Sequence, residues 1–332
     1  MDSNVWMTTV LLTLTGVTAG CASGPDVAGD PVAQRVAQQH SSAPLSRTAV
    51  RRWHAPPHAA AHPDPPAFEY AYTAPQSPDL QPIYARVREV DLLRVLPEVQ
   101  AINSMFVLPR PLRFVTTECG EFGAFYRVAD AEVVLCYETL RTLYARGQAQ
   151  QRLQGLGDDH PLRYVQANVR FIVLHETGHA LVHLLDLPVT GRQEDAVDQL
   201  AAILMLRFAG VEETPAEVTD NLRMAANWML SRSTGAYNLD AYADEHALGE
   251  QRYFNLQCLI YGTDPDGFAG MVGAGDLTAA RANGCARETR LVTRAWLRLL
   301  LPYLAPGYEA YGDEASQYLR TTDPAHPSRS DG

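Results

Sequence analysis

Two histidines and a glutamate in one short segment have the types and spacing of a metal-binding group. His175-Glu176-Thr177-Gly178-His179 is an HExxH pentapeptide. On an α-helix, residues i and i+4 share a face, so the two imidazoles could hold one metal ion while Glu176 reaches a water bound to it. Because so short a motif also arises by chance, its context must support this interpretation.

The segment around the pentapeptide predicts a core helix. Apolar residues recur at helical spacing from Tyr164 to Leu185 and form a wide stripe that would be buried. Leu187-Pro188 predicts the end of this helix, and Thr190-Gly191 predicts a turn. A second helix is then expected to begin near Gln193 and to pack beside the first.

The second helix begins with carboxylates that suit the same metal ion. Glu194 and Asp198 share a face, and Glu194 would complete a His, His, Glu ligand set for one Zn²⁺ ion. Asp198 would then accept the other ring proton of one ligand histidine. Asp195 or Asp198 is the alternative third ligand. Coincidence is the competing explanation, because the helix dipole also favours acidic residues in a first turn.

One further histidine is excluded from the ligand set. His183 follows His179 by four residues, whereas the variant motif with three histidines has its third histidine six residues on, where Leu185 stands. We therefore expect His183 to be a structural or partly exposed residue.

The catalytic roles follow from the chemistry of such a site. Glu176 is expected to act as the general base on a zinc-bound water. Sites of this kind need a second donor for the developing oxyanion, and His246 is the first candidate and Tyr253 the second. The alternative for both residues is packing or ordinary hydrogen bonding. Arg252, between them, is expected to be a salt-bridge or packing residue rather than to bind substrate.

Composition limits the partners. The chain has 332 residues, 46% of them hydrophobic, and a net charge of −11 with no basic patch. One catalytic domain is expected, and nucleic acid and anionic membrane surfaces are unfavourable partners. The sequence does not indicate an oligomeric state.

The amino terminus predicts export. Residues 1–20 read as a signal peptide, because the apolar run from Val5 to Gly20 is short and rich in threonine. Thr18-Ala19-Gly20-Cys21 resembles the lipobox of bacterial lipoproteins, although Thr18 stands where leucine is usual. We expect a protein of the bacterial cell envelope or periplasm, held at the membrane by a lipid on Cys21. A signal peptide cleaved nearby without lipidation, giving a secreted protein, is the alternative.

Four further cysteines predict two disulfides. They are Cys119, Cys136, Cys258 and Cys285. An even number in an exported chain favours disulfides, and three pairings are open. Chain order favours joining the first pair and the last pair, since each then closes one local loop. A cysteine metal site is the alternative, but the CxxC spacing is missing.

The rest of the chain divides into three parts. Residues 21–83 are rich in Ala, Pro and His and predict a flexible tether, residues 84–304 a metallopeptidase domain, and residues 305–332 a mobile polar tail. The domain is predicted as a helix over 86–103 that Pro97 should kink or split, strands over 112–117, 124–128 and 132–137, and helices thereafter, two of them over 277–284 and 287–304. The expected fold class is α+β and zincin-like, with a small N-terminal sheet, an HExxH helix and a mainly helical C-terminal half.

Four separated blocks resemble one family. They are ECGEFGAFY, VVLCYE, HETGHALVHLLDLPVTGRQEDAVDQLAA and DEHALGEQRYFNLQCLIYGTDP. The chain from Tyr84 to Leu304 is similar to a bacterial family regarded as exported zinc metallopeptidases, with no assigned function beyond that. The resemblance implies a gluzincin-like site with His175, His179 and Glu194 as ligands, Glu176 as base and Asp198 behind a histidine. It also implies the disulfide pairing favoured above.

The resemblance extends to a substrate-binding strand. In gluzincins an Asn-Ala segment belongs to the edge strand that pairs with the substrate backbone. Gly123, Ala124 and Phe125 are the matching residues, with Gly123 where the family has asparagine. The alternative is an ordinary core strand.

The sequence thus favours a zinc metallopeptidase acting on a peptide or protein substrate. Two alternatives stay open: a metal-dependent hydrolase of a non-peptide amide, and a non-catalytic envelope binding protein.

Overall fold

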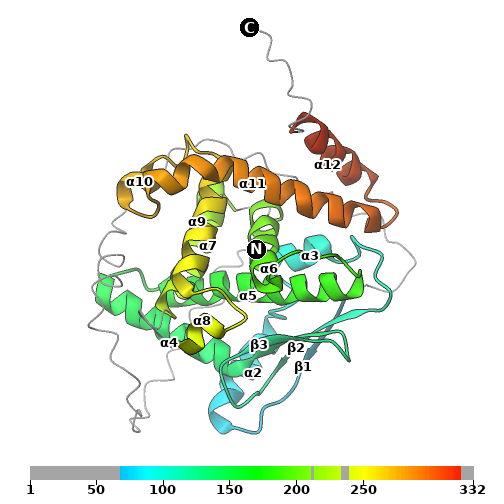
Figure 1. Cartoon of the computed structure of the whole chain (residues 1–332). Helices are drawn as coiled ribbons and strands as arrows, with labels where there is room; N and C mark the ends of the chain where they lie inside the picture. Colours follow the sequence, from blue (N-terminus) through cyan, green and yellow to red (C-terminus); the bar gives the residue numbers. More distant parts are fainter. Residues whose placement is uncertain (1–67, 211–212, 233–238, 323–332) are drawn as a thin grey trace.

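A central helix, α5 (His160–Leu184), organises the fold. The computed structural model describes residues 68–210, 213–232 and 239–322. A small sheet lies on one side of α5, and further helices lie on the other side, beneath a long helix that crosses the top of the view (Figure 1). These are α6 (Gln193–Arg207), α7 (Pro215–Ser231), α9 (Gly249–Thr263) and the crossing helix α11 (Ala279–Leu300). This α+β arrangement, a sheet followed by a mainly helical half, is the predicted fold class.

The sheet has four strands in the order β1-β2-β4-β3. They are β1 (Phe68–Tyr72), β2 (Leu112–Thr117), β3 (Ala124–Arg127) and β4 (Glu132–Cys136). The pairs β1–β2 and β2–β4 are parallel, whereas β3 runs antiparallel to β4 and forms an edge. The predicted strands over 112–117, 124–128 and 132–137 are confirmed within a residue at each end. Strand β1 was not predicted.

The remaining helices include α4 (Tyr137–Gln154), which packs along α5, and several short ones. The short ones are α2 (Gln81–Glu89), α3 (Pro97–Ile102), α8 (Leu239–Ala243), α10 (Gly270–Ala274) and α12 (Glu309–Thr321), with 3₁₀ turns at Pro78–Leu80 and Leu301–Tyr303. The helix expected over 86–103 is two helices, because Pro97 begins a new one. The helices expected over 277–284 and 287–304 are the single α11.

The structure corrects both predicted boundaries of the folded region. Strand β1 lies within residues 21–83, which were predicted as a tether, and α12 lies within residues 305–332, which were predicted as a mobile tail. Prolines near β1 give this segment the composition of a linker. So short a strand is stabilised by its pairing with β2, which the composition does not indicate. The predicted signal peptide and Cys21 lie outside the described residues.

Local signals set the ends of α5. Pro161 occupies the first turn, where the missing N–H costs nothing. At the other end Asp186 adopts a left-handed conformation with φ 49°, and the N–H of Leu187 bonds back to the carbonyl of Val182 at 2.9 Å. This Schellman-type ending turns the chain so that α6 packs back on α5.

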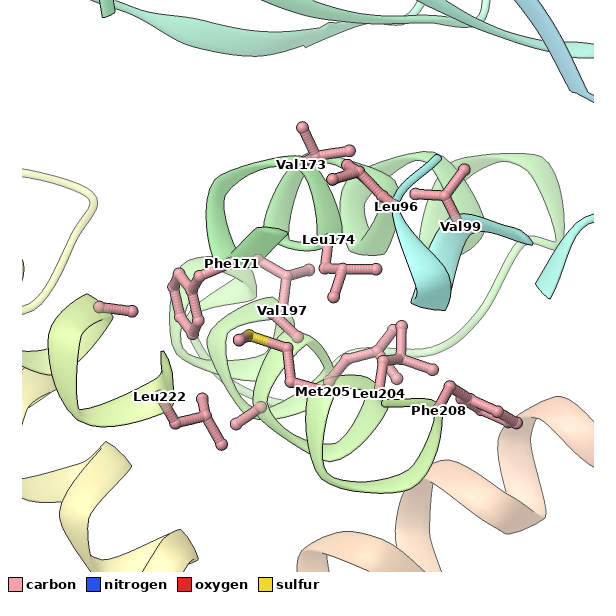
Figure 2. Packing of buried hydrophobic residues seen from close by; sticks show 14 of the residues in the cluster. Leu96, Val99, Phe171, Val173, Leu174, Val197, Leu204, Met205, Phe208 and Leu222 are labelled. Atoms are coloured by element: carbon pink, nitrogen blue, oxygen red, sulfur yellow. The ribbon is translucent and has the colours of Figure 1, made fainter. Parts of the chain in front are cut away.

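The core between α5 and α6 is apolar and fully enclosed. Figure 2 shows Phe171 and Leu174 of α5 facing Val197 and Met205 of α6, and all four are at most 1% exposed. Burial of side chains of this size stabilises by about 2 kcal/mol each. The helix pair that carries the HExxH motif is therefore held rigidly.

A buried ion network attaches α5 to its surroundings. The guanidinium of Arg170 donates to both oxygens of Glu98 on α3, and its other edge donates to Glu213, which precedes α7. Arg170 and Glu98 are at most 1% exposed. Because an unpaired buried charge is costly, this network fixes α3 and the start of α7 relative to α5.

Both predicted disulfides are present. Cys119 pairs with Cys136, and Cys258 of α9 pairs with Cys285 of α11. Two disulfides indicate a non-cytoplasmic location. In the described part of the chain, the search for a helix long and apolar enough to cross a membrane finds none.

Helices α5 and α6 approach each other closely at Gly178, inside the HExxH motif. A Cβ added there would lie 2.8 Å from the Cβ of Val197 and 2.9 Å from its Cγ1. Both neighbours belong to a packed, β-branched side chain that cannot rotate away. A glycine at this position therefore lets α6 bring its first turn against the two histidines.

We expect Gly178→Ala to lower the free energy of unfolding by about 1–3 kcal/mol, as overpacking of a core does. It should also weaken metal binding, because α6 must shift. Gly284→Ala on α11 is the control, since an added Cβ meets nothing within 4 Å there and should be neutral or stabilising. Denaturant unfolding measures both, and a Gly178→Ala protein as stable as the control would contradict the close contact.

Candidate metal centre

Three side chains from α5 and α6 converge on one point. The Nε2 atoms of His175 and His179 are 3.3 Å apart. The Glu194 carboxylate lies across them, with Oε2 3.0 Å from Nε2 of His175 and Oε1 3.2 Å from Nε2 of His179. The site is largely buried, with the three side chains between 7% and 15% exposed. The sequence predicted this trio, and the fold brings it together.

Behind His175 lies a buried carboxylate. Oδ1 of Asp198 is 2.8 Å from Nδ1 of His175, so that nitrogen donates its proton to Asp198. In the neutral ring, Nε2 of His175 is then left with a lone pair directed at His179 and Glu194. Three electron-pair donors that face one another repel unless a positive charge lies between them. The donor set therefore fits a divalent cation.

The electrostatics of the site agree with this. Burial by itself lowers the pKa of His175, but its hydrogen bonds with Asp198 and Glu194 outweigh burial and raise the pKa to about 9. Burial acts to raise the pKa of Glu194, yet hydrogen bonds from His175, His179 and a third histidine, His246, hold it well below its usual range. The surroundings thus favour positive charge at His175 and negative charge at Glu194.

Asp198 is held in place by Arg252 of α9. Nε and Nη2 of the guanidinium lie 2.7 Å from Oδ2 and Oδ1 of Asp198. Burial acts to raise the pKa of Asp198, but Arg252 and His175 together lower it. Arg252 therefore forms the salt bridge predicted for it, and the chain Arg252–Asp198–His175 orients one donor of the site.

The alternative third ligands are not in position. Asp198 is occupied by His175 Nδ1 and by Arg252. Asp195, one residue after Glu194, instead lines a surface depression with Arg192 and Phe254. Among the residues that the structure describes, Glu194 is the one that joins the two histidines in a group whose donor atoms lie within 4.8 Å of one another.

Glu176 lies beside the trio and is 8% exposed. Burial raises the pKa of its carboxyl group, while the nearby His175 and His179 act in the opposite direction. Within the described residues its carboxylate accepts no hydrogen bond, so it is available to a substrate or a water.

His246, the first candidate for a second donor, lies at the open side of the site. Its Nε2 is 3.0 Å from Oε2 of Glu194, and its Nδ1 is 2.9 Å from Oδ1 of Asp244. Its ring stacks on that of His175 with the centroids 6.1 Å apart. The side chain is 39% exposed, so it is accessible from solvent. Sequence reasoning missed Asp244, although the spacing Asp-x-His is visible.

Tyr253, the second candidate, is elsewhere. It is 1% exposed, and its hydroxyl donates to Asp276 at 3.3 Å. Because Tyr253 follows Arg252 on α9, it points about 100° away from the residue that faces the site. The structure therefore corrects this candidate to a buried packing residue.

His183 and the glutamate near the first disulfide take no part in the cluster. Nδ1 of His183 lies 2.9 Å from the hydroxyl of Tyr126, so His183 links α5 to β3. Glu138 is close to Cys119 and Cys136, but these sulfurs are bonded to each other. Glu138 instead accepts from the backbone N–H groups of Cys119 and Gly120.

The strand predicted to bind substrate is an edge strand that contacts α5. The backbone groups of Gly123 are used internally, by Thr139 and by the N–H of Cys136. Since antiparallel pairing alternates, the backbone groups of Ala124 and Tyr126 face the free edge of the sheet. Phe125 is 40% exposed.

We expect Arg252→Met to weaken metal binding by about 10- to 100-fold, because the carboxylate that orients His175 loses both guanidinium contacts. Competition with a chromogenic chelator measures the affinity. Arg281→Met, which removes an ion pair with Glu288 on α11, is the control and should leave the affinity unchanged. Equal affinity in both variants would show that Asp198 needs no support from Arg252.

The comparisons with known proteins agree with this geometry. A family model described as "Putative metallopeptidase" (DUF4344) matches residues 72–300. No curated protein and no solved structure matches the chain. The match spans most of the chain and contains every residue of the cluster, and the protein therefore belongs to this metallopeptidase family.

Proposed function

We propose that this protein is a zinc peptidase that hydrolyses peptide bonds outside the cytoplasm. The observation that carries the proposal is the convergence of Nε2 of His175, Nε2 of His179 and the Glu194 carboxylate beside a buried Glu176. Two imidazoles and one carboxylate are the donor set of catalytic zinc sites, whereas Mg²⁺ and Ca²⁺ prefer oxygen donors throughout. His175, His179 and Glu194 would hold one zinc ion.

Zinc, when bound, supplies a Lewis acid that polarises a carbonyl group and lowers the pKa of water. Glu176 takes the proton of the attacking water and delivers it to the leaving amine. A raised pKa suits a group that must accept a proton and then release it. Asp198 and Arg252 keep His175 in one orientation while this happens.

His246 is the group proposed to stabilise the oxyanion. It lies within hydrogen-bond reach of Glu194, on the exposed side of the site, and Asp244 orients its ring from the other nitrogen. An N–H donor aimed at developing negative charge typically contributes 10²- to 10³-fold.

Ala124 and Tyr126 supply the binding edge. A peptide that adds to β3 as a further strand would bond to their outward-facing backbone groups. The side chain of Phe125 is exposed at this strand. This mode recognises an extended backbone, which favours a peptide over a small non-peptide amide.

The location within the envelope is part of the proposal. The disulfides indicate a non-cytoplasmic location. The leader of residues 1–20 and the Cys21 lipid anchor extend it to an exported, membrane-tethered protein, for which mass spectrometry of the mature protein is the test.

Glu176→Gln is expected to keep zinc and to lose about 10²- to 10⁴-fold in hydrolysis, because the amide cannot accept the proton. Metal analysis of the pure protein and a peptide-library digest, with and without chelator, measure both properties. Glu194→Ala is the matched variant and should lose zinc and activity together. Full activity in Glu176→Gln would contradict the mechanism, and bound zinc without cleavage of any peptide would favour a non-peptide substrate.

His246→Ala is expected to lower kcat by about 10²- to 10³-fold with unchanged zinc content, since it removes a donor and no ligand. His160→Ala is the control, because His160 lies at the start of α5 and bonds to Gln150. If zinc content fell with activity, His246 would be a ligand and not an oxyanion donor.

A further inference from the structure

Two arginines lie beside one tryptophan near the beginning of the edge strand. The guanidinium carbon of Arg146 on α4 lies 4.5 Å from the ring centroid of Trp228 on α7. That of Arg232, just after α7, lies 5.7 Å from the same ring and 5.2 Å from the ring of Phe122. The ring centroids of Phe122 and Trp228 are 5.2 Å apart. Four side chains from three separate segments thus form a cationic, aromatic patch.

Neither guanidinium has a carboxylate partner among the described residues. Arg146 donates to the hydroxyl of Ser231 at 2.7 Å. Residues 233–238, which follow Arg232, include no acidic residue. Partial burial lowers the pKa of Arg232, and the positive charges of Arg252 and Arg146 lower it further, while Asp244 acts in the opposite direction. An anion at the patch would relieve the repulsion between these arginines.

Stacking does not occupy the hydrogen-bonding capacity of Arg232. The aromatic rings cover the faces of a guanidinium, while its five N–H groups lie in its plane. That edge has the geometry for a bidentate carboxylate. The residue itself is exposed, so a ligand can reach it.

The patch adjoins the candidate metal centre. Arg252, which holds Asp198, and Asp244, which holds His246, are close enough to Arg232 for their charges to shift its pKa. Helix α7, which ends just before Arg232, packs against α9, which carries Arg252. Phe122 precedes β3 by two residues, so the patch lies at the beginning of the binding edge, whereas the Tyr126–His183 contact lies toward its end.

The direction of the strand then identifies the ligand. A peptide that pairs antiparallel with β3 runs opposite to it, so its C-terminal side lies toward Phe122 and Arg232. A parallel peptide would bring its N-terminal side there, and a terminal ammonium would be repelled by the two arginines. The patch therefore selects one orientation and one charge.

We infer that Arg232, with Arg146 beside it, binds a carboxylate on the C-terminal side of the scissile bond. This inference rests on the proposed peptidase function and names its substrate class: short peptides whose terminal carboxylate, or an acidic side chain close to it, reaches the patch. A terminal carboxylate and an acidic side chain offer the arginines the same chemical group, so the test is designed to separate these two sources.

The kinetic test uses a cleaved peptide from the library in three forms: with a free C-terminal carboxylate, as the C-terminal amide, and as the amide with an aspartate in the primed segment. We expect the full-length protein to prefer the carboxylate forms by about tenfold or more in kcat/KM, chiefly through KM. Arg232→Gln should remove this preference and leave the amide substrate unchanged. Preference for the free acid alone identifies the terminal carboxylate, and preference for the aspartate form alone identifies a side chain.

The matched control is Arg94→Gln. Arg94 also stacks on an aromatic ring, that of Tyr70 at 4.5 Å, but it pairs with Asp91. This variant should keep the carboxylate preference. Should Arg232→Gln fail to fold, Arg146→Gln provides the second variant. A preference that survives in the folded variants would overturn the inference.

A binding test works without catalysis. In the full-length Glu176→Gln protein, calorimetry compares an N-acetylated dipeptide acid with its amide, and the acid should bind about tenfold more tightly or better. Equal affinities would overturn the inference. If the wild-type protein cleaves no peptide but this difference is present, the proposed function fails and the carboxylate site stands.

Discussion

The contact between α5 and α6 at Gly178 is the constraint on which the site depends. Because the glycine has no side chain, Val197 can pack directly on the HExxH motif. That contact brings Glu194, one turn earlier on α6, across the two histidines, and Asp198, one turn later than Glu194, behind His175. A single helix pair, closed by a Schellman-type turn and an apolar core, thus sets all four side chains.

Charged residues elsewhere in the helical half compensate the buried charges of α5 and α6. Asp198 would be a costly buried anion without Arg252, and α9 brings that arginine to it. The same helix follows the loop that carries Asp244 and His246. The disulfide between Cys258 and Cys285 ties α9 to α11, so the helix that supports the site is itself anchored. Helix α9 therefore orients the donors through Arg252, and His246 lies next to Glu194 of the trio.

The sheet lies on the other side of α5 from these helices (Figure 1). Its edge strand β3 presents unpaired backbone groups, while the first disulfide and Glu138 fix the loop that leads into it. Phe122 belongs to that loop, and its ring contacts the guanidinium of Arg232. Backbone recognition along β3 and charge recognition at its beginning are thus two properties of one segment, and together they would define both the direction and the chemistry of a bound chain.

The sequence alone determined the elements that depend on local chemistry. The HExxH spacing, the ExxxD spacing after a proline-marked turn, three strands and the cysteine order all act through near neighbours or through a strong periodicity, and the structure has them at the predicted residues. The family resemblance, carried by the same blocks, added the expectation of a metallopeptidase, which the family match bears out.

Only the tertiary structure decided what depends on distant contacts. Strand β1 forms because β2 pairs with it. Tyr253 lies outside the site because the preceding residue, Arg252, is the one that faces Asp198. Arg232 has no local pattern that marks it, and the visible Asp-x-His spacing of Asp244 gains a role only because the fold brings His246 to Glu194. The sequence gives the order of the charged residues, but the packing of the helices determines which of them form pairs.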